Sequence, residues 1–75
     1  MTAVEVVFKY QVPPTEVVMR AMDNVREVYG IRRIRFNESD RTIRVEYDAT
    51  RLNEATVAAL LRRTGLGLGE KLQLV

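Results

Sequence analysis

The sequence predicts an α+β domain built on an antiparallel sheet, and three observations lead to this class. Four short segments alternate apolar and polar residues with the period of two that a half-buried strand requires. Two longer segments repeat their apolar residues at the spacing of an amphipathic helix. The six segments follow one another as strand, helix, strand, strand, helix, strand, which places a hairpin at the centre of the chain.

The first strand is expected over residues 3–10, whose inward positions would be apolar: Val4, Val6, Phe8 and Tyr10. Pro13 and Pro14 end it, because proline has no N–H for a strand ladder and suits the first turn of a helix. The first helix is then predicted over residues 16–29. Its buried stripe would be Val18, Met22, Val25 and Tyr29, with Gly30 as the C-cap.

A hairpin follows, with strands expected over residues 31–37 and 42–48 and a turn at residues 38–40. Asn53 is placed as the N-cap of a second helix that Gly65 ends. The buried stripe of this helix would be Val57, Leu60 and Leu61. The last strand is predicted over residues 70–75. Its inward positions would be Leu72 and Leu74, and its outward positions Lys71 and Gln73.

In each predicted strand, alternate residues form one polar set and one apolar set. One face of the sheet should therefore contact water while both helices cover the other. Right-handed crossovers then predict the ferredoxin-like βαββαβ plait, a four-stranded antiparallel sheet with two helices on one face. The chain, residues 1–75, is too short for more than a single domain of this kind.

The absence of cysteine and histidine excludes thiolate nucleophiles, imidazole bases and the usual soft-metal sites. The acidic residues near the hairpin are expected on a solvated surface with no pocket, so they are interpreted as surface charge: Glu38, Asp40, Glu46 and Asp48. The sequence therefore predicts a protein that is not an enzyme and needs no cofactor.

No apolar run approaches the roughly 20 residues of a membrane span, so no membrane partner is expected. The first five residues lack the basic region and cleavage site of a signal peptide, which favours a cytoplasmic location. The formal net charge of +2 is too small to imply nucleic acid. Aromatic residues are also missing from the expected polar face of the sheet, whereas RNA-binding plaits stack bases there.

Three stretches resemble heavy-metal-associated domains. Residues 29–36 are similar to that family's entry into its second strand, residues 43–48 to its third strand, and residues 57–66 to its second helix and closing step. Together they span much of the chain. The resemblance implies the same plait and a Cys-x-x-Cys site for copper(I) or zinc in the loop between the first strand and first helix.

The metal ligands of that family do not carry over to this chain. The corresponding loop lies within residues 11–18, and no alignment of it supplies a thiol. We therefore expect no metal site in a degenerate ligand loop made of Val12, Pro13, Pro14, Thr15, Glu16 and Val17. Leu66 replaces the closing aromatic residue of the family.

The leading hypothesis is a non-catalytic interaction or adaptor domain that resembles a metallochaperone domain. The resemblance implies that a protein partner docks at Val12, Pro13, Pro14 and Leu66. A sheet edge is the other candidate surface, for a partner or for self-association. Two alternatives remain: an accessory in copper or zinc transport with weak or atypical metal affinity, and a dimeric regulatory plait that binds a small ligand.

Overall fold

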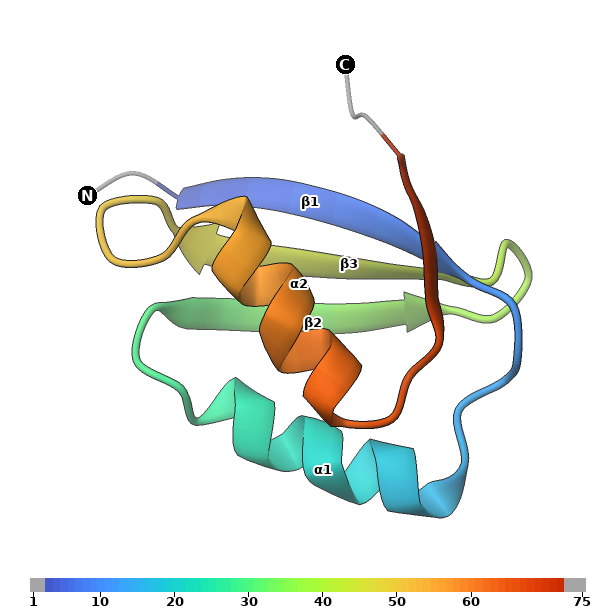
Figure 1. Ribbon diagram of the computed structural model, residues 1–75. Helices are drawn as coiled ribbons and strands as arrows, with labels where there is room; N and C mark the ends of the chain where they lie inside the picture. Colours follow the sequence, from blue (N-terminus) through green and yellow to red (C-terminus); the bar gives the residue numbers. More distant parts are fainter. Residues whose placement is uncertain (1–2, 73–75) are drawn as a thin grey trace.

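The computed structural model describes residues 3–72 as two helices and one antiparallel sheet (Figure 1). The elements follow the predicted order: β1 (Ala3–Tyr10), α1 (Glu16–Arg26), β2 (Ile31–Asn37), β3 (Thr42–Asp48), α2 (Glu54–Arg63) and β4 (Leu68–Leu72). Both hairpin strands coincide with their predicted ranges. This α+β architecture is compatible with the ferredoxin-like plait.

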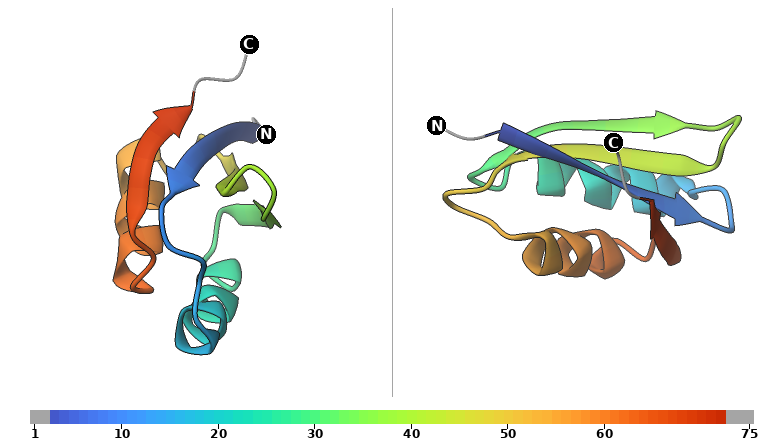
Figure 2. Two further views of the ribbon diagram at one scale, coloured as in Figure 1. Left: turned by 90° about the vertical axis from the view of Figure 1, so that its right-hand side faces the viewer. Right: turned by 90° about the horizontal axis from the view of Figure 1, so that it is seen from above.

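The four strands lie in the order β2–β3–β1–β4, so β2 and β4 form the edges. The central pair, β1 and β3, is antiparallel and places Val6 opposite Val45 and Phe8 opposite Ile43. Figure 2 shows α1 and α2 on the same side of the sheet. The inward side chains of these strands therefore meet the apolar stripes of the helices in one core.

The core is filled by apolar side chains from every helix and strand. Five of them have less than 2% of their surface exposed: Met22, Ile43, Leu61, Val45 and Val57. Tyr10 and Phe36 meet edge to face, with ring centroids 5.9 Å apart. This packing supplies the driving force for folding, since burial of apolar surface contributes about 25 cal/mol per Å².

Helix α1 ends earlier than predicted. The backbone N–H of Glu27 donates to the carbonyls of Asn24 and Val25, which makes Glu27 the C-cap. Tyr29 lies beyond this cap and is 70% exposed, so the prediction that it belongs to the buried stripe is wrong. Gly30 adopts a φ of +104° in the connection to β2, which no other type of residue adopts easily.

Helix α2 begins and ends as predicted. The side chain of Asn53 accepts a hydrogen bond from the backbone N–H of Thr56 at 2.8 Å, and Gly65 follows the helix with a φ of +93°. Val57, Ala58 and Leu61 are buried, whereas Leu60 is only partly buried against the core.

Strand β4 lies at residues 68–72 and begins two residues earlier than predicted. Its residues 71 and 72 also lie on the opposite faces of the sheet from those predicted. Leu68 pairs with Tyr10, but an irregularity in the register then places Lys71 opposite Phe8 and Leu72 opposite Val7. A β-bulge shifts every following side chain to the opposite face. The assignment of Lys71 to the polar face and Leu72 to the core was therefore wrong.

On the helix side, Lys71 Nζ lies 2.8 Å from a carboxylate oxygen of Glu54 at the start of α2. Gln73 and Leu74 lie outside the described residues. Neither helix within residues 3–72 is long and apolar enough to cross a bilayer.

Candidate functional site

The segment between β1 and α1, the expected ligand loop, is held at its first residue by the β2–β3 turn. Tyr10 donates its backbone N–H to the carbonyl of Arg41 at 2.9 Å. The guanidinium of Arg41 donates in return to the carbonyl of Gln11 at 3.2 Å. Arg41 itself has a φ of +53°, so the turn adopts an uncommon backbone conformation where it meets the loop.

The other end of the loop is held by the start of α1. The hydroxyl of Thr15 accepts from the backbone N–H of Val18 at 3.2 Å and caps the helix. Glu16 lies in the first turn of α1, where the helix dipole stabilises a carboxylate. Its carboxylate oxygen lies 2.7 Å from a guanidinium nitrogen of Arg20. Pro14 is half-buried. The loop is therefore tied to the fold on both sides of Val12 and Pro13.

The loop and the first turn of α1 present apolar side chains to solvent. Val12 is 67% exposed and Val17 is 73% exposed, while Met19, in the next turn of the helix, is 36% exposed. Pro13 is exposed beside Val12. We call Val12, Pro13 and Val17 the loop patch.

Leu66, the other residue expected at the docking surface, lies in the hydrophobic core with only 3% of its surface exposed. It directly follows Gly65, where an added Cβ would lie 3.5 Å from the side chain of Val18. The structure thus brings the α2–β4 turn to the first helix but leaves the Leu66 side chain no surface for a partner.

The polar atoms of the loop have roles in the fold. The Thr15 hydroxyl caps α1, and the Glu16 carboxylate pairs with Arg20. Within residues 3–72 no three acidic side chains come together in a way that could hold a metal ion. The side-chain oxygens of the loop, from Gln11, Thr15 and Glu16, are hard donors and poor ligands for copper(I).

The phenol of Tyr10, next to the loop, has a raised pKa. Burial raises the pKa of the Tyr10 hydroxyl, and the negative charge of Glu38 raises it further, while Arg41 acts in the opposite direction. Asp48 is a buried carboxylate, with 7% of its surface exposed. Its pKa is lowered, mainly because it accepts hydrogen bonds from the hydroxyl and backbone N–H of Thr50 at 2.6 and 2.9 Å.

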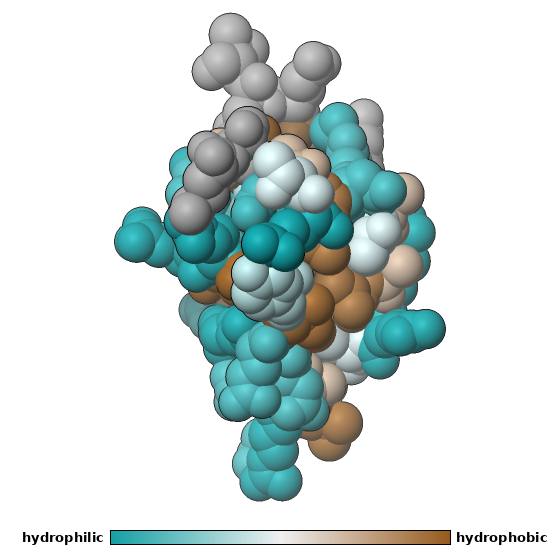
Figure 3. Space-filling view, turned by 90° about the vertical axis from the view of Figure 1, so that its left-hand side faces the viewer, coloured by the Kyte–Doolittle hydropathy of each residue, from teal (hydrophilic) through white to brown (hydrophobic). Residues whose placement is uncertain are grey.

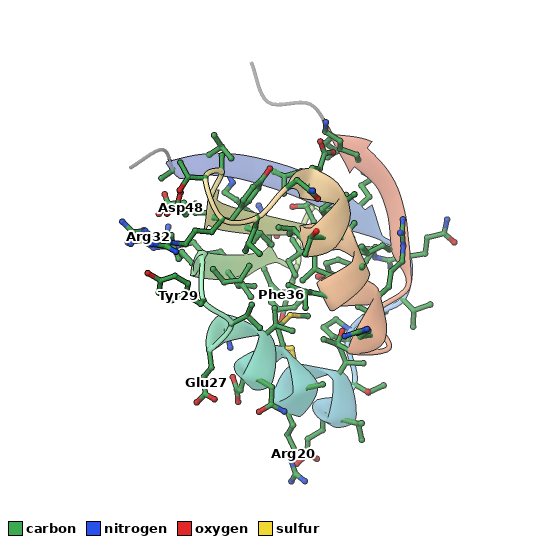
Figure 4. All side chains as sticks on the ribbon, turned by 60° about the vertical axis from the view of Figure 1, so that its left-hand side comes forward. Arg20, Glu27, Tyr29, Arg32, Phe36 and Asp48 are labelled. Carbon is green, nitrogen blue, oxygen red and sulfur yellow. The ribbon has the colours of Figure 1, made fainter. Side chains whose placement is uncertain are left out.

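At the opposite end of the molecule, Tyr29 is exposed where its helical spacing predicts burial. Tyr29 projects away from the core near Arg32 and Asp48, whereas Phe36 points inward (Figure 4). The guanidinium carbon of Arg51 lies 4.1 Å from the centroid of the Tyr29 ring. The helical spacing of Tyr29 carried no sign that α1 ends three residues before it.

The surface at this end combines apolar and charged groups. Figure 3 shows an apolar area bordered by hydrophilic side chains. Ile31 and Leu52 are partly buried against the core, and a hollow of about 330 Å³ is lined by Tyr29, Arg32, Asp48 and Arg51, among others. The cations here are already engaged: Arg51 contacts Tyr29 and lies 3.6 Å from Asp48.

Comparison of the chain with protein-family models and with curated proteins gave no match. The resemblance to heavy-metal-associated domains therefore rests on the three stretches of sequence alone.

Proposed function

We propose that this chain is a ferredoxin-like plait of the heavy-metal-associated type that has lost its metal ligands and acts as a non-catalytic interaction module. Support comes from the order of its elements, from the sheet order and from the placement of both helices against one core. The resemblance to metal-carrier domains then implies a protein partner for the end of the domain that holds the β1–α1 loop.

One observation supports this proposal above the others: the loop patch is apolar and exposed, with Val12 and Pro13 in a loop that is attached to the fold on both sides and Val17 in the first turn of α1. Isolated apolar residues are common on protein surfaces, but Val12 and Val17 lie five residues apart around two prolines. A loop stiffened in this way loses little entropy when it binds. We infer that the partner buries the loop patch and that no metal passes between the two proteins.

The test is chemical-shift mapping of the isotope-labelled chain with a metal-binding domain of a copper-transporting ATPase, the partner class that the resemblance implies. We expect shifts centred on the loop patch. The double variant Val12→Ser and Val17→Ser should weaken binding at least about tenfold, because burial of one valine contributes about 1.5 kcal/mol. Serine and valine have similar helix propensities, so α1 should persist.

The matched control replaces Ala55 and Ala59, two exposed residues of α2, with serine. This control should bind like the wild type. Shifts confined to a sheet edge, or equal affinity of the loop variant and wild type, would contradict the proposal. If the chain does not bind this ATPase domain at all, copper-transporting ATPases are rejected as its partners.

Two further measurements separate the alternatives. Anaerobic titration with copper(I) and zinc should reveal no one-to-one site of sub-micromolar affinity, and such a site would favour the transport accessory instead. Sedimentation over a range of concentrations addresses the dimeric plait, for which β2 and β4 supply the free edges of the described sheet. A monomer at all concentrations would count against that reading.

A further inference from the structure

The face of the sheet opposite the helices carries an in-register row that crosses all four strands. Arg35 of β2 lies opposite Arg44 of β3, Arg44 lies opposite Val7 of β1, and Val7 lies opposite Leu72 of β4. We call these four residues the outer row. Both helices lie on the other side of the sheet (Figure 2), so no helix covers the outer row.

One half of the outer row consists of two arginines on adjacent strands. Like charges directly opposite each other on adjacent strands repel, which makes the Arg35–Arg44 pair unfavourable by itself. Arg44 is compensated by Glu5, whose carboxylate lies 3.3 Å from its guanidinium. Among the described side chains, which leave out that of residue 70, no ion pair to Arg35 occurs. Its guanidinium is therefore available to a carboxylate or phosphate oxygen.

The other half of the outer row is apolar. Val7 is only 5% exposed although it points away from the helix-side core, and Leu72 beside it is half-buried. The β-bulge between β1 and β4 is what brings Leu72 to this face. Cationic and apolar groups thus lie next to each other along a single line across the sheet.

A groove of about 810 Å³ contains the outer row, a size typical of small-molecule sites. Thr42 and Asn37 add polar atoms along its wall, and Glu38 and Asp40 border it at the β2–β3 turn. These two carboxylates would repel a second negative charge on a ligand. A phosphate backbone would also meet Glu5 and Glu46 on the same face, which disfavours nucleic acid.

We propose that the outer row binds a small organic monoanion that carries an apolar group. The anionic head would contact Arg35 and Arg44, and the apolar group would pack against the half-buried side chain of Leu72 beside Val7. This site is separate from the loop patch, so it does not depend on the proposed docking function.

The experiment titrates the labelled chain with three probes: hexanoate, acetate and 1-hexanol. Hexanoate combines both features of the proposed ligand, whereas acetate has only the charge and hexanol only the chain. We expect saturable shifts from hexanoate at the outer row, with a dissociation constant at least about tenfold below those of the other two. Added NaCl should weaken the binding of hexanoate but not that of hexanol.

Two variants test the two halves of the site. Arg35→Gln should raise the dissociation constant of hexanoate about tenfold, the loss of one charged contact. Leu72→Ser should raise the dissociation constant of hexanoate to a value close to that of acetate. The control Arg62→Gln makes the same change of charge in the last turn of α2 and should have no effect.

Unchanged binding in Arg35→Gln would overturn the proposal, as would shifts confined to the groove between the helices at Val25 and Leu60. Equal affinity for hexanoate and acetate would also overturn it. If a variant unfolds, the salt dependence and the probe comparison in the wild type decide the question.

Discussion

The connection from α1 to β2 depends on a glycine, and Gly30→Ala should destabilise the fold strongly. The backbone of Gly30 has a φ of +104°, which side chains with a Cβ rarely adopt. A Cβ built there would lie 3.0 Å from both Cγ and Cδ1 of Leu52. The carbonyl of Gly30 also accepts a hydrogen bond from the backbone N–H of Asp48 at 2.8 Å, so the backbone cannot move away without losing it.

The expected cost has two parts. A left-handed backbone conformation costs a residue other than glycine about 1–2 kcal/mol. The contact with Leu52 adds an overpacking penalty of about 1–3 kcal/mol. The sum, about 2–5 kcal/mol, is a large share of the roughly 4–11 kcal/mol expected for 75 residues. The melting temperature should fall by about 8 °C or more, since about 1 kcal/mol corresponds to about 4–8 °C at this size.

Urea unfolding followed by circular dichroism measures this free energy. The matched control is Gly67→Ala, because an added Cβ there meets nothing within 4 Å. That variant should be neutral or about 0.4–1 kcal/mol more stable. In a Leu52→Ala background, Gly30→Ala should cost about 1–3 kcal/mol less, since the contact is removed. A Gly30→Ala protein within about 0.5 kcal/mol of wild type would refute this reasoning.

Three further predictions concern the core, the sheet and the pH dependence. Met22→Ala should cost about 2–5 kcal/mol, because Met22 is fully buried, whereas the more exposed Met19→Ala should stay within about 0.5 kcal/mol of wild type in urea unfolding. Lys71→Gln removes the ion pair with Glu54 and should cost about 0.2–1 kcal/mol at low salt. This cost should vanish in concentrated NaCl, and a cost that is independent of salt would argue against the ion pair. The lowered pKa of Asp48 stabilises the fold fully above the carboxyl pKa of the unfolded chain, and this contribution disappears as the pH falls through the lower pKa of the folded state. Urea unfolding between about pH 6 and about pH 2 should therefore show the stability advantage of the wild type over Asp48→Asn shrinking with acid, and a constant difference would contradict this.

The candidate site was only partly predictable from the sequence. Residue types alone located an apolar loop around two prolines and excluded soft metal ligands. Whether each side chain faces solvent depends on packing from distant parts of the chain, which is why Val12 is exposed while Leu66 is buried. The alignment of the outer row depends on the register of all four strands, which alternation along a single strand does not give.

The sequence by itself determined the order of the elements, the two hairpin strands and the caps of α2, since these follow from local periodicity and from backbone preferences of asparagine and glycine. Only the tertiary structure decided where α1 ends and which face Leu72 occupies. Tyr29 keeps helical spacing beyond the last turn of α1, so periodicity cannot mark that end. A single β-bulge beside Phe8 reverses the parity of β4, because alternation along a strand says which residues share a face but not which face it is.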